Sequence, residues 1–503
     1  MARKVFKSAL IVSASIFGSR VLGLLRDITI AAFFGATSLT DAFFVAFRIP
    51  NLLRRIFAEG AFSSAFTPAF AKKLKSSLKE AKLFAEEFFS ILLISLILTV
   101  ILGEIFAPLI INLIAPGIAG EYFDLAVRLL REMLPYIFFV SLVAFFGGIL
   151  NGFEHFFAPA FSTALFNLSM IIFAFLLAPE ISIEALSIGV IVGGIFQVLL
   201  QLIFLRKFNF LIKPRFRISK DVKKTLKNII PGIFGFAVRQ FSMLIDTVLA
   251  SFLKAGAISY LYYANRFVQL PLGMFAVGLS QVLLPRLAKK SSKKEDYTFE
   301  LLNGLLLCAS IVIPASVGLI FFGKPIIDIV FNHGKFSEIA LSETYLVLIG
   351  YSIGLYFFSL EKIITNAYYS LDEYRFPVVV SASTLIFNLF VNLVLCFVLD
   401  FGVSGLAVGT SLTSFLNVLI LSFYFQKREG IALMKEFFKN LVKYLTLSIP
   451  VAIVSFVGAK VYFLQGSFLL KVAVIVATIG ISAFSYFLLL YLTKDKVIRL
   501  IKT

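Results

Sequence analysis

The sequence has few of the residues from which enzymes and metalloproteins build their sites. Of its 503 residues, two are cysteines and two are histidines. Cys308 and Cys396 lie within apolar segments without metal-ligand spacing, so we interpret them as small hydrophobic residues. His155 and His333 have no metal-binding companions, and the motifs HExxH, GxSxG and D-x-D do not occur. These absences argue against zinc, serine-hydrolase and nucleotide-sugar chemistry.

Charged residues are also scarce for a chain of this length. They make up 15% of the sequence, hydrophobic residues make up 60%, and the mean hydropathy is +0.97. This composition predicts a polytopic membrane protein rather than a soluble domain. The formal net charge of +19 does not require nucleic acid as a partner, because the basic residues fall between apolar runs, where the positive-inside rule accounts for them.

The apolar runs are long enough to cross a bilayer as helices. At about 20 or more residues per span, they predict an all-α fold with fourteen transmembrane helices. The first run is expected to be a retained helix and not a signal peptide, because Arg20 and Asp27 interrupt it and no cleavage pattern follows. Prolines near the spans, such as Pro135 and Pro271, are candidate kinks. The predicted spans are 6–34, 41–71, 86–114, 122–152, 158–178, 182–206, 228–254, 258–285, 298–323, 341–369, 376–399, 403–426, 436–463 and 468–492.

The connections between the spans differ in charge. Of the connections counted alternately along the chain, most in one set are rich in lysine and arginine. Those in the other set are nearly free of these residues, as at 35–40, 116–120, 179–183 and 465–467. By the positive-inside rule, this pattern predicts an even number of spans with both termini in the cytoplasm. The basic connections are 72–79, 206–227, 286–294, 427–443 and the tail from Lys494.

Charged residues inside the spans recur in the second half of the chain. Arg20 precedes Asp27 by seven residues, and Arg239 precedes Asp246 by the same interval. Unless apolar helices match by chance, this recurrence indicates a parallel repeat of two six-helix lobes, with the substrate held where the lobes meet. An arginine then follows each aspartate and stands shortly before a proline, in the corresponding pairs Arg48 with Pro50 and Arg266 with Pro271.

The repeat divides the chain into four predicted parts. Residues 1–210 form the first lobe, with helices 1 to 6, and residues 228–430 form the second, with helices 7 to 12. The basic and loosely amphipathic stretch 211–227 between them is expected to lie along the cytoplasmic surface. Residues 431–503, with the last two spans and the tail, fall outside the repeat.

A row of charges follows one face of the second predicted span. Asp41, Arg48, Arg55 and Glu59 are spaced by seven, seven and four residues, which places them on one stripe of a helix. In the first span, Arg20 and Asp27 likewise share a face, with Arg26 about 120° away if the helix is straight. Such charges are too costly to face lipid and must line water, a substrate or a partner helix.

Two interpretations of these charges remain open from the residues alone. They can form buried ion pairs that hold helices together, or they can bind a ligand. Arginines outnumber the acids, and a surplus of guanidinium groups suits the oxygens of a phosphorylated or otherwise anionic substrate, which in a membrane wall would carry a lipid tail. The arginines are Arg20, Arg26, Arg48, Arg54, Arg55, Arg239 and Arg266, and the acids are Asp27, Asp41, Glu59 and Asp246.

A cation site is a further hypothesis. Asp246 on the seventh span, with Asn388 and Asn392 one turn apart on the eleventh, offers oxygen ligands for a monovalent cation such as sodium. The alternative is that the asparagines form hydrogen bonds between helices. No other cofactor is expected.

Three stretches resemble the MviN/MurJ family of lipid II flippases, within the multidrug/oligosaccharidyl-lipid/polysaccharide exporter superfamily. They are SRVLGLLRD at 19–27, TDAFFVAFRIPNLLRRIFAEGAFSSAFTPAF at 40–70 and LYYANRFVQLPLGMFAVGLSQVLLPRLAK at 261–289. The resemblance implies two six-helix lobes around a central cationic cavity, and two extra helices that form a groove for a polyprenyl tail. It also implies a transporter of the bacterial cytoplasmic (inner) membrane that serves peptidoglycan biosynthesis and is not an enzyme.

The resemblance assigns roles to particular residues. The essential arginines of the family correspond to Arg20, Arg26, Arg54 and Arg266, and Asp41 corresponds to a functionally sensitive acid. Arg55 and Glu59 fall in the same motif as Arg54. One position departs from the pattern: Asn265 stands where many members have an aspartate, which puts the salt-bridge role of that acid in doubt.

The resemblance implies alternating access as the mechanism. The expected substrate is undecaprenyl-diphosphate-linked disaccharide-pentapeptide, whose diphosphate Arg26, Arg54 and Arg266 would hold, and cell-wall synthesis proteins are expected partners. Because the chain has no nucleotide-hydrolysis motif, an ion gradient, the membrane potential or consumption of the product would drive transport. The rival hypotheses are a cation-coupled exporter or polysaccharide-lipid flippase of the same superfamily, and a membrane enzyme that acts on polyprenyl phosphates.

Overall fold

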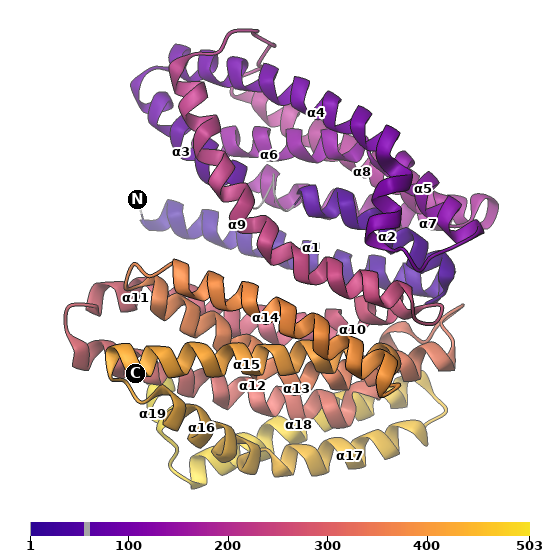
Figure 1. The fold of residues 1–503 in the computed structure, drawn as a ribbon, viewed down its shortest axis with the longest axis vertical. Coiled ribbons are helices and arrows are strands. Elements are labelled where there is room, and N and C mark those ends of the chain that lie inside the picture. Colours follow the sequence, from indigo (N-terminus) through magenta and orange to yellow (C-terminus); the bar gives the residue numbers. More distant parts are fainter. Residues whose placement is uncertain (1, 55–60, 503) are drawn as a thin grey trace. The chain divides into compact units, whose positions relative to one another are not determined.

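The apolar runs of the sequence form helices in the computed structural model, because a backbone within a membrane must satisfy its own N–H and C=O groups. The structure describes residues 2–54 and 61–502, without the side chains of residues 2–14, 16, 61–64, 228, 230–243, 501 and 502. No β-strand occurs among these described residues. The chain forms two compact units, Met1–Ile258 and Ser259–Thr503 (Figure 1).

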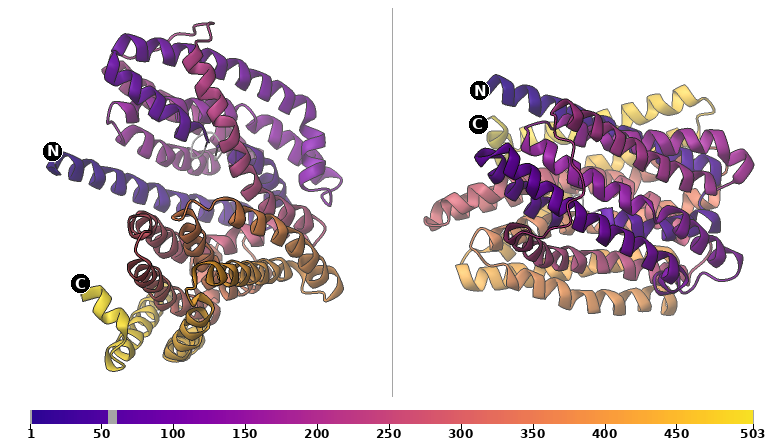
Figure 2. Two further views of the ribbon diagram at one scale, coloured as in Figure 1. Left: turned by 60° about the vertical axis from the view of Figure 1, so that its left-hand side comes forward. Right: turned by 90° about the horizontal axis from the view of Figure 1, so that it is seen from above.

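The first unit consists of nine helices in the described ranges, up to residue 256. Figures 1 and 2 show these helices packed together, and the last of them, which ends at Ser251, crosses the others obliquely in the view of Figure 1. They are α1 (Ala2–Phe34), α2 (Ser38–Arg54), α3 (Ala61–Ser76), α4 (Leu78–Ile114), α5 (Glu121–Met133), α6 (Tyr136–Gly152), α7 (Phe157–Ile181), α8 (Glu184–Lys207) and α9 (Lys220–Ser251).

The second unit begins within α10 and includes two short π-helical turns. Its helices are α10 (Ala257–Pro271), η2 (Leu272–Val277), α11 (Gly278–Lys290), α12 (Lys294–Phe331), α13 (Glu338–Tyr369), α14 (Arg375–Leu393), η3 (Val394–Val398), α15 (Gly402–Glu429), α16 (Leu433–Leu447), α17 (Ile449–Phe463), α18 (Phe468–Leu492) and α19 (Lys496–Lys502).

The helices agree with a chain that crosses a membrane many times. Among the described residues, ten helices are long and apolar enough to span a bilayer, and an eleventh is added if the bent pair α16 and α17 is one span. The predicted all-α, multi-spanning class is therefore confirmed. Three predicted spans fall on helices whose side chains or backbone are described only in part, namely 6–34, 41–71 and 228–254. The count of fourteen spans therefore stays a prediction.

Several predicted spans are interrupted where proline removes a backbone donor. The span 122–152 is broken between α5 and α6, where Pro135 directly precedes α6. The span 436–463 bends by 45° between α16 and α17, and a proline occupies the first turn of α17. The span 258–285 passes through η2 directly after Pro271. Since proline cannot donate to the helical ladder, each of these breaks has a local cause.

The connection between α8 and α9, which covers much of the predicted linker 211–227, is extended. Residues 210–219 have no regular secondary structure, and α9 begins at Lys220. The backbone N–H of Arg215 donates to Ser90 Oγ on α4 at 2.5 Å, and that of Ser219 donates to Glu87 Oε2 at 3.0 Å. These bonds fix the connection against α4.

Helix α9 is bonded to the first unit near both of its ends. Near its start, Lys73 Nζ on α3 lies 2.5 Å from Asp221 Oδ2. At its end, the N–H of Gly117 donates to Ser251 Oγ at 3.0 Å. The repeat assigns this helix to the second lobe, whereas its contacts place it in the first compact unit. The predicted four-part division itself stays a prediction.

Phenylalanine rings pack α3, α4 and α6 of the first unit together. The ring of Phe66 on α3 lies 5.8 and 5.0 Å from Phe84 and Phe88 on α4, and 4.9 Å from Phe145 on α6, between centroids. All four rings are buried. Aromatic pairs at these distances favour tilted and offset packing, which gives this part of the unit a close-packed interior.

Two buried aspartates bond helices of the second unit to one another. Asp328, near the end of α12, accepts hydrogen bonds from Tyr462 Oη on α17 at 2.6 Å and from Lys471 Nζ on α18 at 3.0 Å, and it also accepts from Asn332 at 2.7 Å. We call these four residues the Asp328 cluster. It fastens α17 and α18 to α12.

The second buried aspartate, Asp495, lies just beyond the end of α18. It accepts hydrogen bonds from Tyr444 Oη on α16 at 3.1 Å and from the N–H of Val497 at 3.0 Å, and Lys443 Nζ lies 2.5 Å from its other oxygen. We call these four residues the Asp495 cluster. It joins the end of α16 to the junction of α18 and α19.

Candidate substrate-binding site

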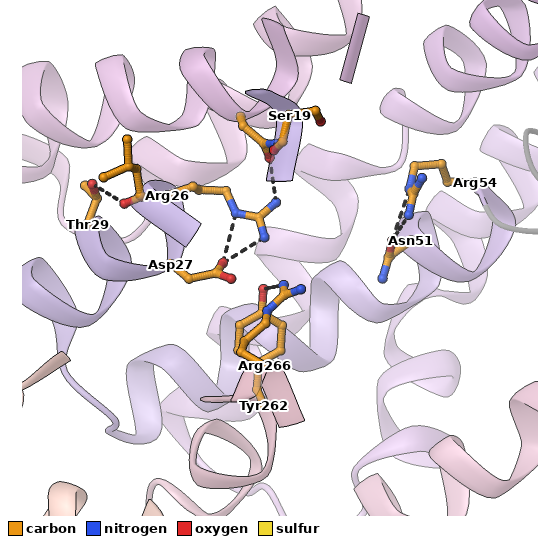
Figure 3. Close-up of polar contacts among 10 residues, drawn as sticks. Ser19, Arg26, Asp27, Thr29, Asn51, Arg54, Tyr262 and Arg266 are labelled. Atoms are coloured by element: carbon orange, nitrogen blue, oxygen red, sulfur yellow. Dashed lines mark hydrogen bonds and ion pairs between the residues drawn. The ribbon is translucent and has the colours of Figure 1, made fainter. Parts of the chain in front are cut away.

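A buried ion pair occupies the middle of α1. Arg26 donates from Nε and Nη2 to Asp27 Oδ1 at 3.0 and 2.7 Å, and the two residues are 8% and 1% exposed (Figure 3). The sequence placed Arg26 on another face of α1 than Asp27. Its long side chain nevertheless reaches the adjacent carboxylate, so no bend of the helix is needed to bring the two charges together.

Asn167 on α7 connects this ion pair to the backbone of α1. Its Oδ1 accepts a hydrogen bond from Arg26 Nη1 at 3.0 Å, and its Nδ2 donates to the carbonyl of Ser19 at 3.0 Å. Asn167 is 4% exposed. The Asn167 amide therefore bonds both the guanidinium of Arg26 and the backbone of α1 seven residues earlier. These two bonds restrict the position of Arg26 relative to α7.

The charged stripe of the second predicted span is described only up to Arg54. Arg54 donates from Nε and Nη2 to Asn51 Oδ1 at 3.2 and 3.1 Å, within α2 (Figure 3). Arg48 is half-buried on the same helix. Arg55 and Glu59 lie outside the described residues. The stripe thus stays a prediction beyond Arg54.

Asp41, at the start of α2, is buried and bonded to a distant backbone group. Its Oδ2 accepts a hydrogen bond from the N–H of Gly256 at 2.7 Å, and the residue is 6% exposed. Gly256 has φ +88°, a conformation that L-residues rarely adopt, so glycine is suited to this turn between α9 and α10. The predicted sensitive acid therefore anchors the turn that follows α9.

Tyr136 links the two arginine sites of the first unit electrostatically. This residue begins α6, is fully buried, and lies close enough to Arg54 and Arg26 to sense both charges. Its hydroxyl makes no hydrogen bond to a described residue. Arg20, in contrast, is exposed on α1. The arrangement combines guanidinium groups with one buried hydroxyl donor, and both suit the oxygens of an anion.

Arg266 lies in the second unit, on α10. Its Nη2 donates to the hydroxyl of Tyr262 one turn earlier on α10, and its guanidinium carbon lies 4.5 Å from the centre of the Tyr262 ring (Figure 3). This stacking stabilises the cation through the face of the ring. Asn265, at the position that departs from the family pattern, accepts a hydrogen bond from Gln269 at 3.2 Å.

The three residues of the predicted cation site belong to different units. Asp246 lies on α9 in the first unit, and Asn388 and Asn392 lie on α14 in the second. Asn392 Nδ2 donates to Asn388 Oδ1 at 3.2 Å, and Asn388 Nδ2 donates to Thr413 Oγ1 on α15 at 3.1 Å. Asn388 thus makes an interhelical bond, as the alternative interpretation expects, whereas the bond between the two asparagines lies within α14. The cation site stays a prediction.

Four residues of this region were not singled out by the sequence analysis. Asn51 and Tyr262 lie three and four positions before the arginines that they bond, so helical spacing alone would have found them. Asn167 and Tyr136 reach α1 and α2 from other helices, and no local pattern indicates them.

A family profile described as "Lipid II flippase MurJ" matches residues 30–495 of the chain. The chain is 38% identical over 461 residues to a probable lipid II flippase MurJ of Buchnera aphidicola, with 90% of each chain covered. It is 34% identical over 498 residues to one of Aquifex aeolicus, with 99% of this chain and 96% of that protein covered. The chain belongs to the MurJ family.

Solved structures agree with this assignment. A structure described as "Lipid II flippase MurJ, inward closed conformation" is 30% identical and superposes with a TM-score of 0.77, covering 96% of this chain and 99% of that chain. An inward-facing multidrug transporter of the MATE family is 15% identical with a TM-score of 0.69, covering 85% of this chain and 99% of that chain. This second match shows a shared fold alone. The MurJ-family chain is therefore a multi-pass membrane transporter and not an enzyme.

Proposed function

We propose that this chain carries lipid II, the undecaprenyl-diphosphate-linked disaccharide-pentapeptide, from the cytoplasmic to the outer leaflet of the bacterial inner membrane. Membership of the MurJ family supports this substrate, as does a surplus of positive charge on α1 and α2. Among the described side chains of these helices there are four arginines and two carboxylates, which leaves two excess positive charges: Arg20, Arg26, Arg48 and Arg54 against Asp27 and Asp41. A diphosphate supplies the missing negative charge.

The single observation that carries the proposal is the buried Arg26–Asp27 pair. A guanidinium that is already desolvated and oriented binds an incoming phosphate at a low cost in side-chain entropy. Binding requires the phosphate to compete with Asp27 for the Nε and Nη2 donors. Affinity for the headgroup is thereby limited, which suits a carrier that must also release its substrate on the other side.

The finer architecture is part of the proposal. Fourteen spans would form two six-helix lobes in parallel repeat around a central cationic cavity, with both termini in the cytoplasm. Arg54 from the first lobe and Arg266 from the second would hold the diphosphate together with Arg26. The last two spans would provide the groove for the polyprenyl tail, and rocking of the lobes would give alternating access.

A monovalent cation such as sodium is proposed as the coupling ion, with Asp246, Asn388 and Asn392 as ligands. Protein unfolding in detergent tests this part alone. Sodium should raise the melting temperature of the wild type and not of Asp246→Ala. An equal response of the two proteins to sodium, or no response of the wild type, overturns the cation site and leaves the substrate proposal standing.

Complementation in a bacterium depleted of its own flippase tests the central claim. Arg26→Ala, Arg54→Ala and Arg266→Ala should each fail to restore growth while inserting at wild-type levels, and lipid-linked wall precursor should accumulate. Arg128→Ala is the matched control, because Arg128 is an exposed arginine paired at 3.3 Å with Glu184, and such surface pairs contribute little. Normal growth with all three site variants would contradict the proposal.

A further inference from the structure

A basic pocket lies beside the end of α18 and contains none of the arginines described above. It has a volume of about 430 Å³ and is lined by residues from the end of α16 and from the junction of α18 and α19, all within the second unit. The residues that line it are Lys443, Thr446, Leu447, Thr493, Lys494, Asp495 and Lys496. Three ammonium groups therefore surround one carboxylate.

The carboxylate of Asp495 is occupied by the protein. It is 3% exposed and is bonded within the Asp495 cluster to Lys443, Tyr444 and the N–H of Val497. Burial raises the pKa of this carboxyl, but the bonds that it accepts outweigh burial and leave the pKa below its ordinary value. Asp495 stays ionised at neutral pH and neutralises Lys443.

The other two lysines are uncompensated. Lys494 and Lys496 are exposed, and neither makes an ion pair with a described residue. Lys494 is held with φ +52°, because the N–H groups of Lys494 and Asp495 donate back to Tyr491 and Leu490 as the helix ends. This fixed turn keeps two positive charges at the mouth of the pocket.

An apolar surface directly adjoins the pocket. On α18, Leu488, Tyr491 and Leu492 are 43%, 64% and 65% exposed, and across the pocket Leu445 and Ile449 are 46% and 53% exposed. In a membrane protein, such side chains face lipid tails. The pocket therefore lies where the hydrocarbon-facing surface gives way to basic residues, which is the level of phospholipid headgroups.

We propose that this pocket binds the phosphate of an anionic glycerophospholipid, with Lys494 and Lys496 on the phosphate oxygens and the acyl chains against the apolar side chains of α18. Charge complementarity is the reason for this occupant, since no carboxylate among the described residues pairs with Lys494 or Lys496 and two positive charges are left over. Basic pockets beside transmembrane helices favour anionic over zwitterionic headgroups. A bound lipid would contact both α16 and α18 and stabilise their packing against each other.

Lipid titration of the full-length protein in an uncharged detergent tests this site. Phosphatidylglycerol should raise the melting temperature, and native mass spectrometry should detect its retention, with phosphatidylcholine giving neither effect. In Lys494→Ala/Lys496→Ala the affinity for phosphatidylglycerol should fall by about 30-fold, as expected for the loss of two lysines near an anionic headgroup. Lys494→Arg/Lys496→Arg should retain the wild-type affinity.

The control variant is Lys223→Ala/Lys224→Ala, which removes the same charge from an exposed stretch of α9. It should bind phosphatidylglycerol as the wild type does, and an equal loss in this variant would show nonspecific attraction and overturn the site. Equal affinity in the wild type and in Lys494→Ala/Lys496→Ala would do the same. Inorganic phosphate is the remaining probe: if it stabilises the protein as much as phosphatidylglycerol does, the pocket binds a soluble anion and the lipid proposal is wrong.

Discussion

The site arginines and the last helices handle buried charge in different ways. Arg26, Arg54 and Arg266 each bond a side chain on their own helix, at one, three and four positions, and Arg26 donates in addition to Asn167 on α7. The aspartates of the Asp328 and Asp495 clusters bond across helices, to residues as far as 143 and 51 positions away. When a ligand displaces a partner on the same helix, the arginine stays where it is. A bond between two helices, in contrast, breaks only if the helices separate.

This difference indicates a division of labour. Contacts within one helix cost little to exchange, so they suit side chains that must bind and release a headgroup. Contacts between α12, α16, α17 and α18 hold the last helices in a fixed arrangement. Variants in the two regions should therefore affect different properties, with binding changed in the first and stability in the second.

The largest effect on stability is expected from Asp328→Ala. This change removes the acceptor of both Tyr462 and Lys471, and breaking a buried ion pair costs about 3–5 kcal/mol. Thermal unfolding in detergent measures the loss. Asp328→Ala/Lys471→Met should recover part of it, because the second change removes the uncompensated cation. A stable Asp328→Ala protein that no longer supports growth would reverse the assignment of this cluster.

Asn167→Leu should have an intermediate effect, and on transport more than on stability. The change deprives Arg26 and the Ser19 carbonyl of one partner each, at about 1–3 kcal/mol, and transport should fall by roughly tenfold. Asn167→Asp keeps the acceptor for Arg26 and loses the donor to Ser19, so it separates the two bonds. Growth rate and precursor accumulation in the depleted strain provide the measurement. Wild-type transport by Asn167→Leu would remove Asn167 from the site.

Asn51→Ala should have a smaller effect. Arg54 is half-buried and can hydrate its guanidinium when Asn51 is absent, so we expect a loss of about 1 kcal/mol or less in stability. Transport should decline by less than in Arg54→Ala, measured in the same complementation assay. An effect as large as that of Arg54→Ala would mean that Asn51 itself contacts the substrate.

The smallest effect is expected at the exposed pair of Lys73 and Asp221. The hydrogen bond from Lys73 lowers the pKa of Asp221 below its ordinary value. The pair therefore contributes its stability above the unfolded pKa of about 4, and loses it as pH falls through the lower folded value. Asp221→Asn should be less stable at neutral pH by under about 1 kcal/mol, because the pair is solvent-exposed, and the difference should vanish in acid. A difference that persists at pH 2 to 3 would exclude this electrostatic origin.

Hydropathy predicted the positions of most helices because each apolar run must form its own hydrogen bonds in a membrane. The break at Pro135 and the passage into η2 after Pro271 were indicated by those prolines. Local patterns do not reveal which helices meet. Asn167 bonds Arg26 across 141 positions, and this contact depends on the packing of α1 against α7, which no periodicity in the sequence specifies. Helix α9 likewise belongs to the first compact unit because of its bonds to α3 and to Gly117. Its place in the sequence repeat does not indicate this.

The bonds near both ends of α9 determine where the chain can be divided into two fragments for reconstitution. A cut within residues 210–219 would leave the fragment that begins with α9 without Lys73, Gly117 and Asp41, the groups to which residues 221 to 256 are bonded. A cut in the basic connection at 291–293, between α11 and α12, keeps all of these bonds inside one fragment. Co-expression of the two fragments should therefore yield a working transporter more readily from the later cut.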